Sequence, residues 1–356
     1  MLVVDPDAHY IEDHRELANY VPEPMRTRLQ KAKLGHLLSN STGDRFMSGR
    51  IQRPLIKSLE KAPANESYGL QRPEDVPAIM KFLGVDISVQ LPGKMLQLST
   101  AQQRDVAVAL CEGFAQYMID QVVDPSEGIY SMIIAPHQDP ERAAELIYRF
   151  AESPGMCAVC FITQGISPPL GDRHYDPIYR AAQDVELPIV YHANGASIDH
   201  FPIRGFQKFL ETHTLGFIFY NLATLVSMLV QGVPERFPRL KFSFQEAGIF
   251  YIPMLMHRLD AGYKKRRSEA PLLKRLPSEY MMDFYYGTQP MEEPNDIKQL
   301  EMMFEMIDAP NTLIYSSDYP HWDFDMPSRI TDLPFLSDEG KAKILGGNAV
   351  DLYRFV

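Results

Sequence analysis

The stretch that decides the fold is VVDPDAHYIED, from Val3 to Asp13. It starts with an apolar run and ends in acids and a histidine, before any helical pattern begins. Asp7 and His9 are two residues apart, so in a β-strand their side chains point to the same face. Glu12 follows them in the next loop. The stretch therefore predicts a buried strand that carries functional side chains at its carboxyl end.

Seven further runs share this design, in which a short segment rich in β-branched or aromatic residues ends in polar side chains. They lie near Val85, Ile133, Val159, Val190, Phe242, Tyr285 and Ile314. Continuous apolar runs are typical of parallel strands buried on both faces. Segments with helical spacing and acidic starts fall between them, such as residues 139–153 and 294–308.

This alternation of strands and helices predicts an α/β protein, a (β/α)8 TIM barrel. The alternative is an open doubly wound sheet, which would need a nucleotide-binding fingerprint. Neither GxGxxG nor GxxxxGK[ST] occurs in the sequence.

The domain organisation follows from composition. Residues 16–79 are rich in Pro, Arg, Lys and Ser and show no strand pattern. They predict a long insertion after strand 1, which either folds over the barrel mouth as a lid or serves as an oligomer contact. Residues 196–216 predict a second mouth loop. Because no repeat or low-complexity linker is evident, we expect one domain over residues 1–356.

Composition also narrows the partners. The net charge is −11, and no basic run is longer than KKRR at 264–267, which argues against nucleic acid. We recognise no apolar stretch of the roughly 18 to 20 residues that a membrane span needs, and no signal peptide. The three cysteines, Cys111, Cys157 and Cys160, include one CxxC pair in a strand-like run. We expect buried, reduced thiols in a soluble cytoplasmic protein with a small-molecule substrate.

The strand ends carry the chemistry. In a (β/α)8 barrel the carboxyl ends of all eight strands meet at one mouth. Imidazole and carboxylate together are typical ligands of Zn, Mn or Fe, and carboxylates packed there without a cation would repel one another. The sequence therefore predicts a site for a divalent metal, with one or two ions. Its candidate ligands are Asp7, His9, Glu12, His192, Glu246 and Asp318.

Four residues are candidates for catalysis. Asp318 and Glu246 qualify because a carboxylate at the mouth can take or deliver a proton. His321 follows Asp318 closely and is expected to orient it. His213 is expected to reach the site from the loop after strand 5.

Four segments also resemble the amidohydrolase superfamily, and within it the amidohydrolase-2 branch of metal-dependent hydrolases and decarboxylases. They are DPDAHYIED from Asp5, the segment that ends in PIVYHANG, ERFPRLKFSFQEAG from Glu235, and SSDYPHWDFD from Ser316. The resemblance covers nearly the whole chain outside the insertion. It implies a barrel with one or two divalent ions at its mouth and a homo-oligomer, a dimer or higher.

The resemblance assigns roles residue by residue. Asp7 stands where the family has its first ligand, and His192 matches the strand-5 metal histidine. Asp318 matches the strand-8 aspartate, which is both a ligand and a proton shuttle. Two features depart from the pattern: Glu246 replaces a strand-6 histidine, and no lysine ends strand 4.

Three functions remain open. The first is hydrolysis by metal-activated water, or nonoxidative decarboxylation, of a small organic acid or amide. The second is a dinuclear non-heme iron or manganese oxygenase, a hydroxylase, because Glu246 makes the ligand set richer in carboxylate. The third is a non-catalytic partner subunit.

Overall fold

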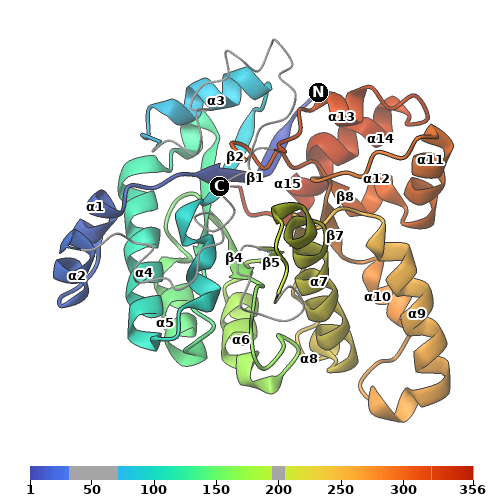
Figure 1. Ribbon diagram of the computed structural model, residues 1–356, viewed down its shortest axis with the longest axis horizontal. Helices are drawn as coiled ribbons and strands as arrows, with labels where there is room; N and C mark the ends of the chain where they lie inside the picture. Colours follow the sequence, from blue (N-terminus) through green and yellow to red (C-terminus); the bar gives the residue numbers. More distant parts are fainter. Residues whose placement is uncertain (32–70, 195–204, 322, 356) are drawn as a thin grey trace.

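Eight parallel strands form one sheet in the order β1 to β8, and helices pack around it (Figure 1). This computed structural model describes residues 1–31, 71–194, 205–321 and 323–355. The predicted (β/α)8 barrel is confirmed, and each of the eight predicted runs contains a strand. The strands are β1 Val4–Tyr10, β2 Ile87–Pro92, β3 Ile129–Ile134, β4 Met156–Ile162, β5 Ile189–His192, β6 Phe242–Gln245, β7 Tyr285–Gly287 and β8 Leu313–Ile314.

The segment after β8 closes the sheet onto β1. The Asp318 N–H donates to the Asp7 carbonyl, and the His9 N–H donates to the Tyr319 carbonyl, both at a distance of 2.8 Å. Below them, the buried Asp5 carboxylate accepts from the Ser317 N–H at 2.9 Å and from the Ser317 hydroxyl at 2.5 Å. This seam fixes the end of β1 against the segment that carries Asp318.

Helices alternate with the strands on the outside of the barrel (Figure 1). Several start as their sequence predicts. Asp139, for example, caps α5 by accepting from the Arg142 N–H, and Pro140 occupies the first turn. The α-helices of the described residues are α1 His14–Leu17, α2 Met25–Lys31, α3 Asp75–Leu83, α4 Arg104–Tyr117, α5 Pro140–Phe150, α6 Asp176–Asp184, α7 Phe209–Val230, α8 Val233–Arg236, α9 Tyr251–Arg266, α10 Pro277–Met281, α11 Ile297–Met306, α12 Ala309–Thr312, α13 Ser328–Thr331, α14 Asp338–Ala342 and α15 Asn348–Leu352. A further short helix, η4, spans Lys94–Thr100 after β2.

The described parts of the predicted insertion are helical. Helices α1 and α2 lie outside α4 (Figure 1), and α3 is the helix that leads into β2. The chain between α1 and α2 packs closely on α4. A methyl group added at Gly113 of α4 would lie 2.5 Å from the side chain of Val21. Residues 32–70 lie outside the described residues, so the proposed lid or oligomer-contact role of the insertion stays a prediction.

The second predicted mouth loop is wrong over 209–216, since α7 begins at Phe209. The Glu211 carboxylate accepts from the Lys208 N–H at 2.8 Å and so starts the helix early. Residues 195–204 lie outside the described residues. Leu210–Val230 is also long and apolar enough to cross a membrane, contrary to the expectation from sequence, with 39% of its most apolar window buried. Length and composition alone are weak evidence for a span, because core helices of globular proteins meet the same criterion.

The cysteines are confirmed as free, buried thiols. Cys157 and Cys160 lie in β4, and burial raises the pKa of both thiols above its ordinary value. Buried thiols of this kind are protonated and unreactive.

Gly171 offers a stability test of how α7 seats on the barrel. A methyl group at this position would lie 2.2 Å from the backbone oxygen of Ser227 in α7. Because a backbone atom cannot swing aside, we expect Gly171→Ala to lower the free energy of unfolding by about 2 kcal/mol or more. Gly262→Ala in α9 is the matched control, since among the described residues no atom beyond its chain neighbours and its own helix backbone lies within 4 Å of the added methyl group. It should leave stability unchanged or raise it by about 0.5–1 kcal/mol in urea denaturation, and equal losses in the two variants would contradict the contact.

Candidate metal centre and active site

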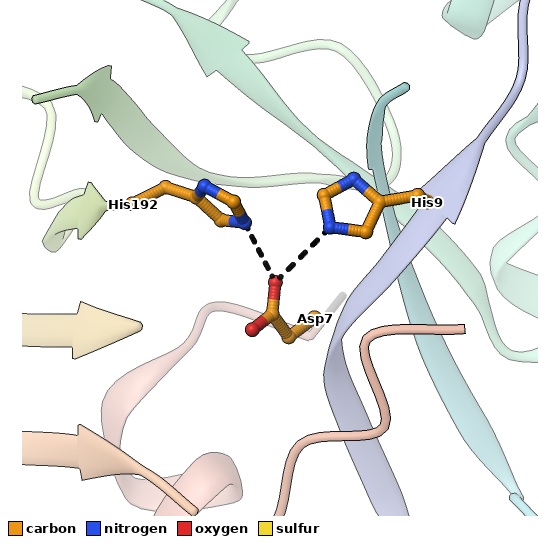
Figure 2. A group of neighbouring side chains, drawn as sticks. All are labelled: Asp7, His9 and His192. Carbon is orange, nitrogen blue, oxygen red and sulfur yellow. Dashed lines mark hydrogen bonds and ion pairs between the residues drawn. The ribbon is translucent and has the colours of Figure 1, made fainter. Parts of the chain in front are cut away.

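Three buried side chains from opposite parts of the chain meet at the barrel mouth (Figure 2). Asp7 and His9 project from β1, and His192 ends β5. The Oδ1 atom of Asp7 lies 3.0 Å from His192 Nε2 and 3.8 Å from His9 Nε2. Ligands bound about 2.0–2.2 Å from one ion are spaced in this way, about 3 to 4 Å apart.

Asp318 and His321 adjoin this group and share His9 with it. Asp318 Oδ1 lies 3.0 Å from His9 Nε2, and it accepts a hydrogen bond from Nδ1 of His321. Two overlapping sets of ligand atoms result, Asp7–His9–His192 and His9–Asp318–His321, each within 4.8 Å. The predicted meeting of Asp7, His9, His192, Asp318 and His321 at one mouth is what the structure shows.

The ring of His9 presents its Nε2 atom to two aspartates. Its Nδ1 lies 3.1 Å from the Pro92 carbonyl oxygen, which can only accept, so Nδ1 must carry the proton. The lone pair of a neutral His9 is then on Nε2, the atom that faces the two aspartates. A backbone carbonyl on the second nitrogen is the usual support of a metal-bound histidine.

Unpartnered buried oxygens complete the fit to a cation. Among the described residues, Asp7 Oδ2, Asp318 Oδ2 and Glu246 Oε2 form no hydrogen bond. No lysine or arginine of the described residues forms an ion pair with these three carboxylates, whose ion-pair partners are histidines. A buried cluster of like charges is costly, and a divalent cation removes that cost. The donor set of carboxylate oxygen and imidazole nitrogen suits Zn, Mn or Fe.

The pKa values follow the same crowding. Burial, followed by the charges of Asp318 and Asp7, raises the pKa of Glu246 well above its ordinary value. Burial acts in the same direction on Asp318, but His321 and His9 together outweigh it and lower the pKa of Asp318. Burial alone would lower the pKa of His9, yet the hydrogen bond and charge of Asp318, with the charge of Asp7, raise it. The crowding of buried charges thus moves the pKa values of Glu246 and Asp318 in opposite directions.

Glu246 and Asp318 also share an unusual backbone. Their φ angles are +57° and +60°, in the left-handed region that side chains other than glycine rarely adopt. Glu246 directly follows β6, and Asp318 lies in the segment after β8. Strain of this kind gathers at functional sites.

Glu246 lies beside His192 rather than among the closest ligand atoms. The strands pair His192 with Gln245, so Glu246 comes one residue beyond, and its Oε2 is 3.4 Å from Nδ1 of His192. The two atoms form no hydrogen bond at this distance, so Glu246 lies beside the second nitrogen of a candidate metal ligand. A direct metal contact by Glu246 stays a prediction.

The structure gives Glu12 partners other than the candidate ligands. Its buried carboxylate accepts the backbone N–H groups of Gly93, Lys94 and Met95. Neither of the two ligand sets contains it. The prediction that Glu12 is a metal ligand is therefore replaced by a backbone contact, because its side chain turns toward the loop after β2.

His213 reaches the mouth from α7 and not from a loop. Its Nε2 lies 3.2 Å from Asp323 Oδ2, and its ring packs on Phe217. Asp323, five residues after Asp318, adds a small contribution to the raised pKa of Glu246, so the pair belongs to the electrostatic surroundings of the site. Sequence reasoning missed Asp323, although it lies in the quoted DYPHWD segment, and it missed Asp5, which the apolar start of β1 conceals.

A (β/α)8 barrel with a histidine and aspartate cluster at the carboxyl ends of its strands defines a class of enzymes that work at this mouth. The chain belongs to the Amidohydrolase family, whose sequence profile matches residues 5–355. This confirms the resemblance to the amidohydrolase superfamily.

Solved structures share the fold over the whole chain. An amidohydrolase from Mycobacterium avium subsp. paratuberculosis K-10 is 20% identical, with a TM-score of 0.75, 99% of this chain and 98% of that chain covered. A dihydroxybenzoic acid decarboxylase from Polaromonas sp. JS666, with bound manganese and the inhibitor 2-nitroresorcinol, is 16% identical, with a TM-score of 0.66 and coverage of 99% and 96%. A 5-carboxyvanillate decarboxylase from Sphingomonas paucimobilis is 18% identical, with a TM-score of 0.65 and coverage of 100% and 99%.

Proposed function

We propose that the protein is a divalent-metal-dependent enzyme that decarboxylates, without oxidation, a small hydroxylated organic acid. The observation that carries the proposal is the convergence of Asp7, His9, His192 and Asp318 on one buried point where carboxylate oxygens lack partners. The decarboxylase neighbours, one of them with bound manganese, support this choice over hydrolysis.

The chain's own residues would divide the work as follows. Asp7, His9, His192 and Asp318 would hold the ion, which when bound orients the substrate oxygens and withdraws electron density from them. The C–C bond that joins the carboxylate to the substrate breaks and CO2 leaves. The electron pair of this bond stays on the substrate carbon that carried the carboxylate. His321, which donates a hydrogen bond to the ionised Asp318, would hold a proton at the mouth and deliver it to that carbon. In hydrolysis the same pair would take a proton from the attacking water.

Metal analysis combined with a CO2-release assay tests the proposal. We expect about one Mn or Zn ion per chain after native purification or reconstitution. We also expect CO2 release from dihydroxybenzoates or 5-carboxyvanillate that stops after chelation and returns with Mn2+. A chain that binds no divalent ion even after reconstitution would overturn the metal centre. Metal binding without metal-dependent CO2 release from any hydroxybenzoate would overturn decarboxylation.

A second candidate, a dinuclear non-heme oxygenase, has a specific observation in its favour. The sets Asp7–His9–His192 and His9–Asp318–His321 overlap at His9, and Glu246 adds a carboxylate next to them. Carboxylate-rich sites favour iron and manganese. Two iron ions per chain with substrate-dependent O2 uptake would establish this reading in place of the first.

A further inference from the structure

The buried carboxylate of Glu12 holds the start of the segment after β2. Its Oε1 accepts from the Met95 N–H at 2.7 Å, and its Oε2 accepts from the N–H groups of Gly93 and Lys94 at 3.0 and 3.2 Å. Glu12 is fully buried, and among the described residues no lysine or arginine side chain forms a hydrogen bond or ion pair with its carboxylate. Burial raises the pKa of Glu12, and the three backbone donors offset part of that effect in place of a cation.

The segment that Glu12 holds runs between the two histidine-bearing strands. We call residues 92–96 the brace. At one end, the Pro92 carbonyl accepts from Nδ1 of His9. At the other end, the Leu96 carbonyl accepts from the side-chain N–H of Asn194, two residues after His192, at 2.6 Å. The brace thus contacts His9 on β1 directly. It contacts Asn194 just after β5 and so reaches His192 only indirectly.

We propose that Glu12 is a positioning residue that seats the brace, so that the Pro92 carbonyl fixes the ring of His9 with Nε2 toward the ion. This inference rests on the metal site of the proposed function. It assigns to Glu12 an effect on metal affinity without contact with the metal. A continuous series of contacts links Glu12 to the site. The Glu12 carboxylate accepts from the backbone of Gly93–Met95, the adjoining Pro92 carbonyl contacts Nδ1 of His9, and Nε2 of His9 faces the aspartates.

The chemistry of the contact predicts how substitutions behave. In Glu12→Gln, one acceptor oxygen becomes an amide N–H group that opposes the N–H groups of the brace. Gly93→Ala disturbs the same contact while leaving Glu12 intact, because the added methyl group would lie 2.3 Å from the Ile11 side chain and 3.3 Å from the Tyr10 carbonyl oxygen. Both changes should push the brace away from β1.

The experiment is a Mn2+ titration of the full chain, with free Mn2+ followed by electron paramagnetic resonance. We expect Glu12→Gln and Gly93→Ala each to weaken Mn2+ binding about 10- to 100-fold, the range for residues that orient a ligand. Because both act through the brace, the double variant should be no weaker than the weaker single variant. Asp260→Asn is the control, since Asp260 also caps backbone and hydroxyl donors, those of Ser278, but on the α9–α10 arm. It should bind Mn2+ like the wild type.

The outcomes separate this inference from the proposed function. If the wild type binds no Mn2+, the metal site itself fails. If the wild type binds and both variants bind equally well, the positioning role is refuted. If Glu12→Gln weakens binding while Gly93→Ala does not, Glu12 acts as a direct ligand and the inference is overturned. Circular dichroism of each variant checks folding, and Gly93→Ala alone carries the test if Glu12→Gln does not fold.

Discussion

His192→Ala is expected to weaken Mn2+ binding by more than about 100-fold while the barrel stays folded. His192 supplies a buried Nε2 that lies 3.0 Å from Asp7 Oδ1, and a ligand in the first coordination sphere matters at least as much as the residues that orient it. Alanine also leaves Glu246 without its histidine neighbour. Titration calorimetry with Mn2+ measures the loss, and far-UV circular dichroism measures folding.

A second histidine serves as the control for this result. His257 lies exposed on α9, so His257→Ala removes an imidazole from the surface. It should change neither Mn2+ affinity nor the melting temperature. Wild-type affinity in His192→Ala would contradict the site, and an equal loss in His257→Ala would show nonspecific binding.

The strands of the fold were predictable from sequence because burial on both faces leaves a continuous apolar run. The runs at Val159 and Val190, for instance, correspond to β4 and β5. The barrel mouth was predictable for a related reason. Parallel strands bring their carboxyl ends together, so Asp7, His9 and His192 had to meet whatever the loops do.

The loops were less predictable, because a side chain there follows a local turn and not a repeating pattern. Glu12 and Glu246 looked equivalent in sequence as acids just beyond strands. In the structure the Glu12 side chain points toward the brace. Glu246, whose backbone is left-handed, instead lies next to His192. No spacing rule distinguishes the two, since the difference depends on which backbone donors lie nearby.

The start of α7 shows a different limit. Residues 209–216 contain Gly216 and two threonines, which weaken a helical signal. The Glu211 carboxylate nonetheless caps the backbone at Lys208, and the helix then carries His213 to the mouth. A capping contact of this kind depends on a single acid in the first turn of the helix. The overall composition of the segment does not reveal it.

Asp5 lies at the seam between β1 and the segment after β8, and Asp5→Ala should lower the free energy of unfolding by about 3 kcal/mol. Alanine removes the acceptor of three buried donors, the Ser317 N–H, the Ser317 hydroxyl and the Asp7 N–H. Burial raises the pKa of Asp5 to about 6, with a smaller contribution from the charge of Asp7, so its removal also relieves some repulsion. The loss of an acceptor for these three donors outweighs that relief, because each buried unpaired donor costs about 1–3 kcal/mol.

A double-mutant cycle with Ser317→Ala identifies the contact that is lost. Urea denaturation at pH 8, where Asp5 is ionised, should give a coupling energy between Asp5 and Ser317 of about 1–2 kcal/mol. Asp120→Ala is the control, since Asp120 is an exposed acid on the surface, and its effect should stay within about 0.5 kcal/mol. Additive effects of Asp5→Ala and Ser317→Ala would mean that the carboxylate does not hold the seam. The position of Asp318 against β1 would then rest on the backbone hydrogen bonds of Asp318 and His9 alone.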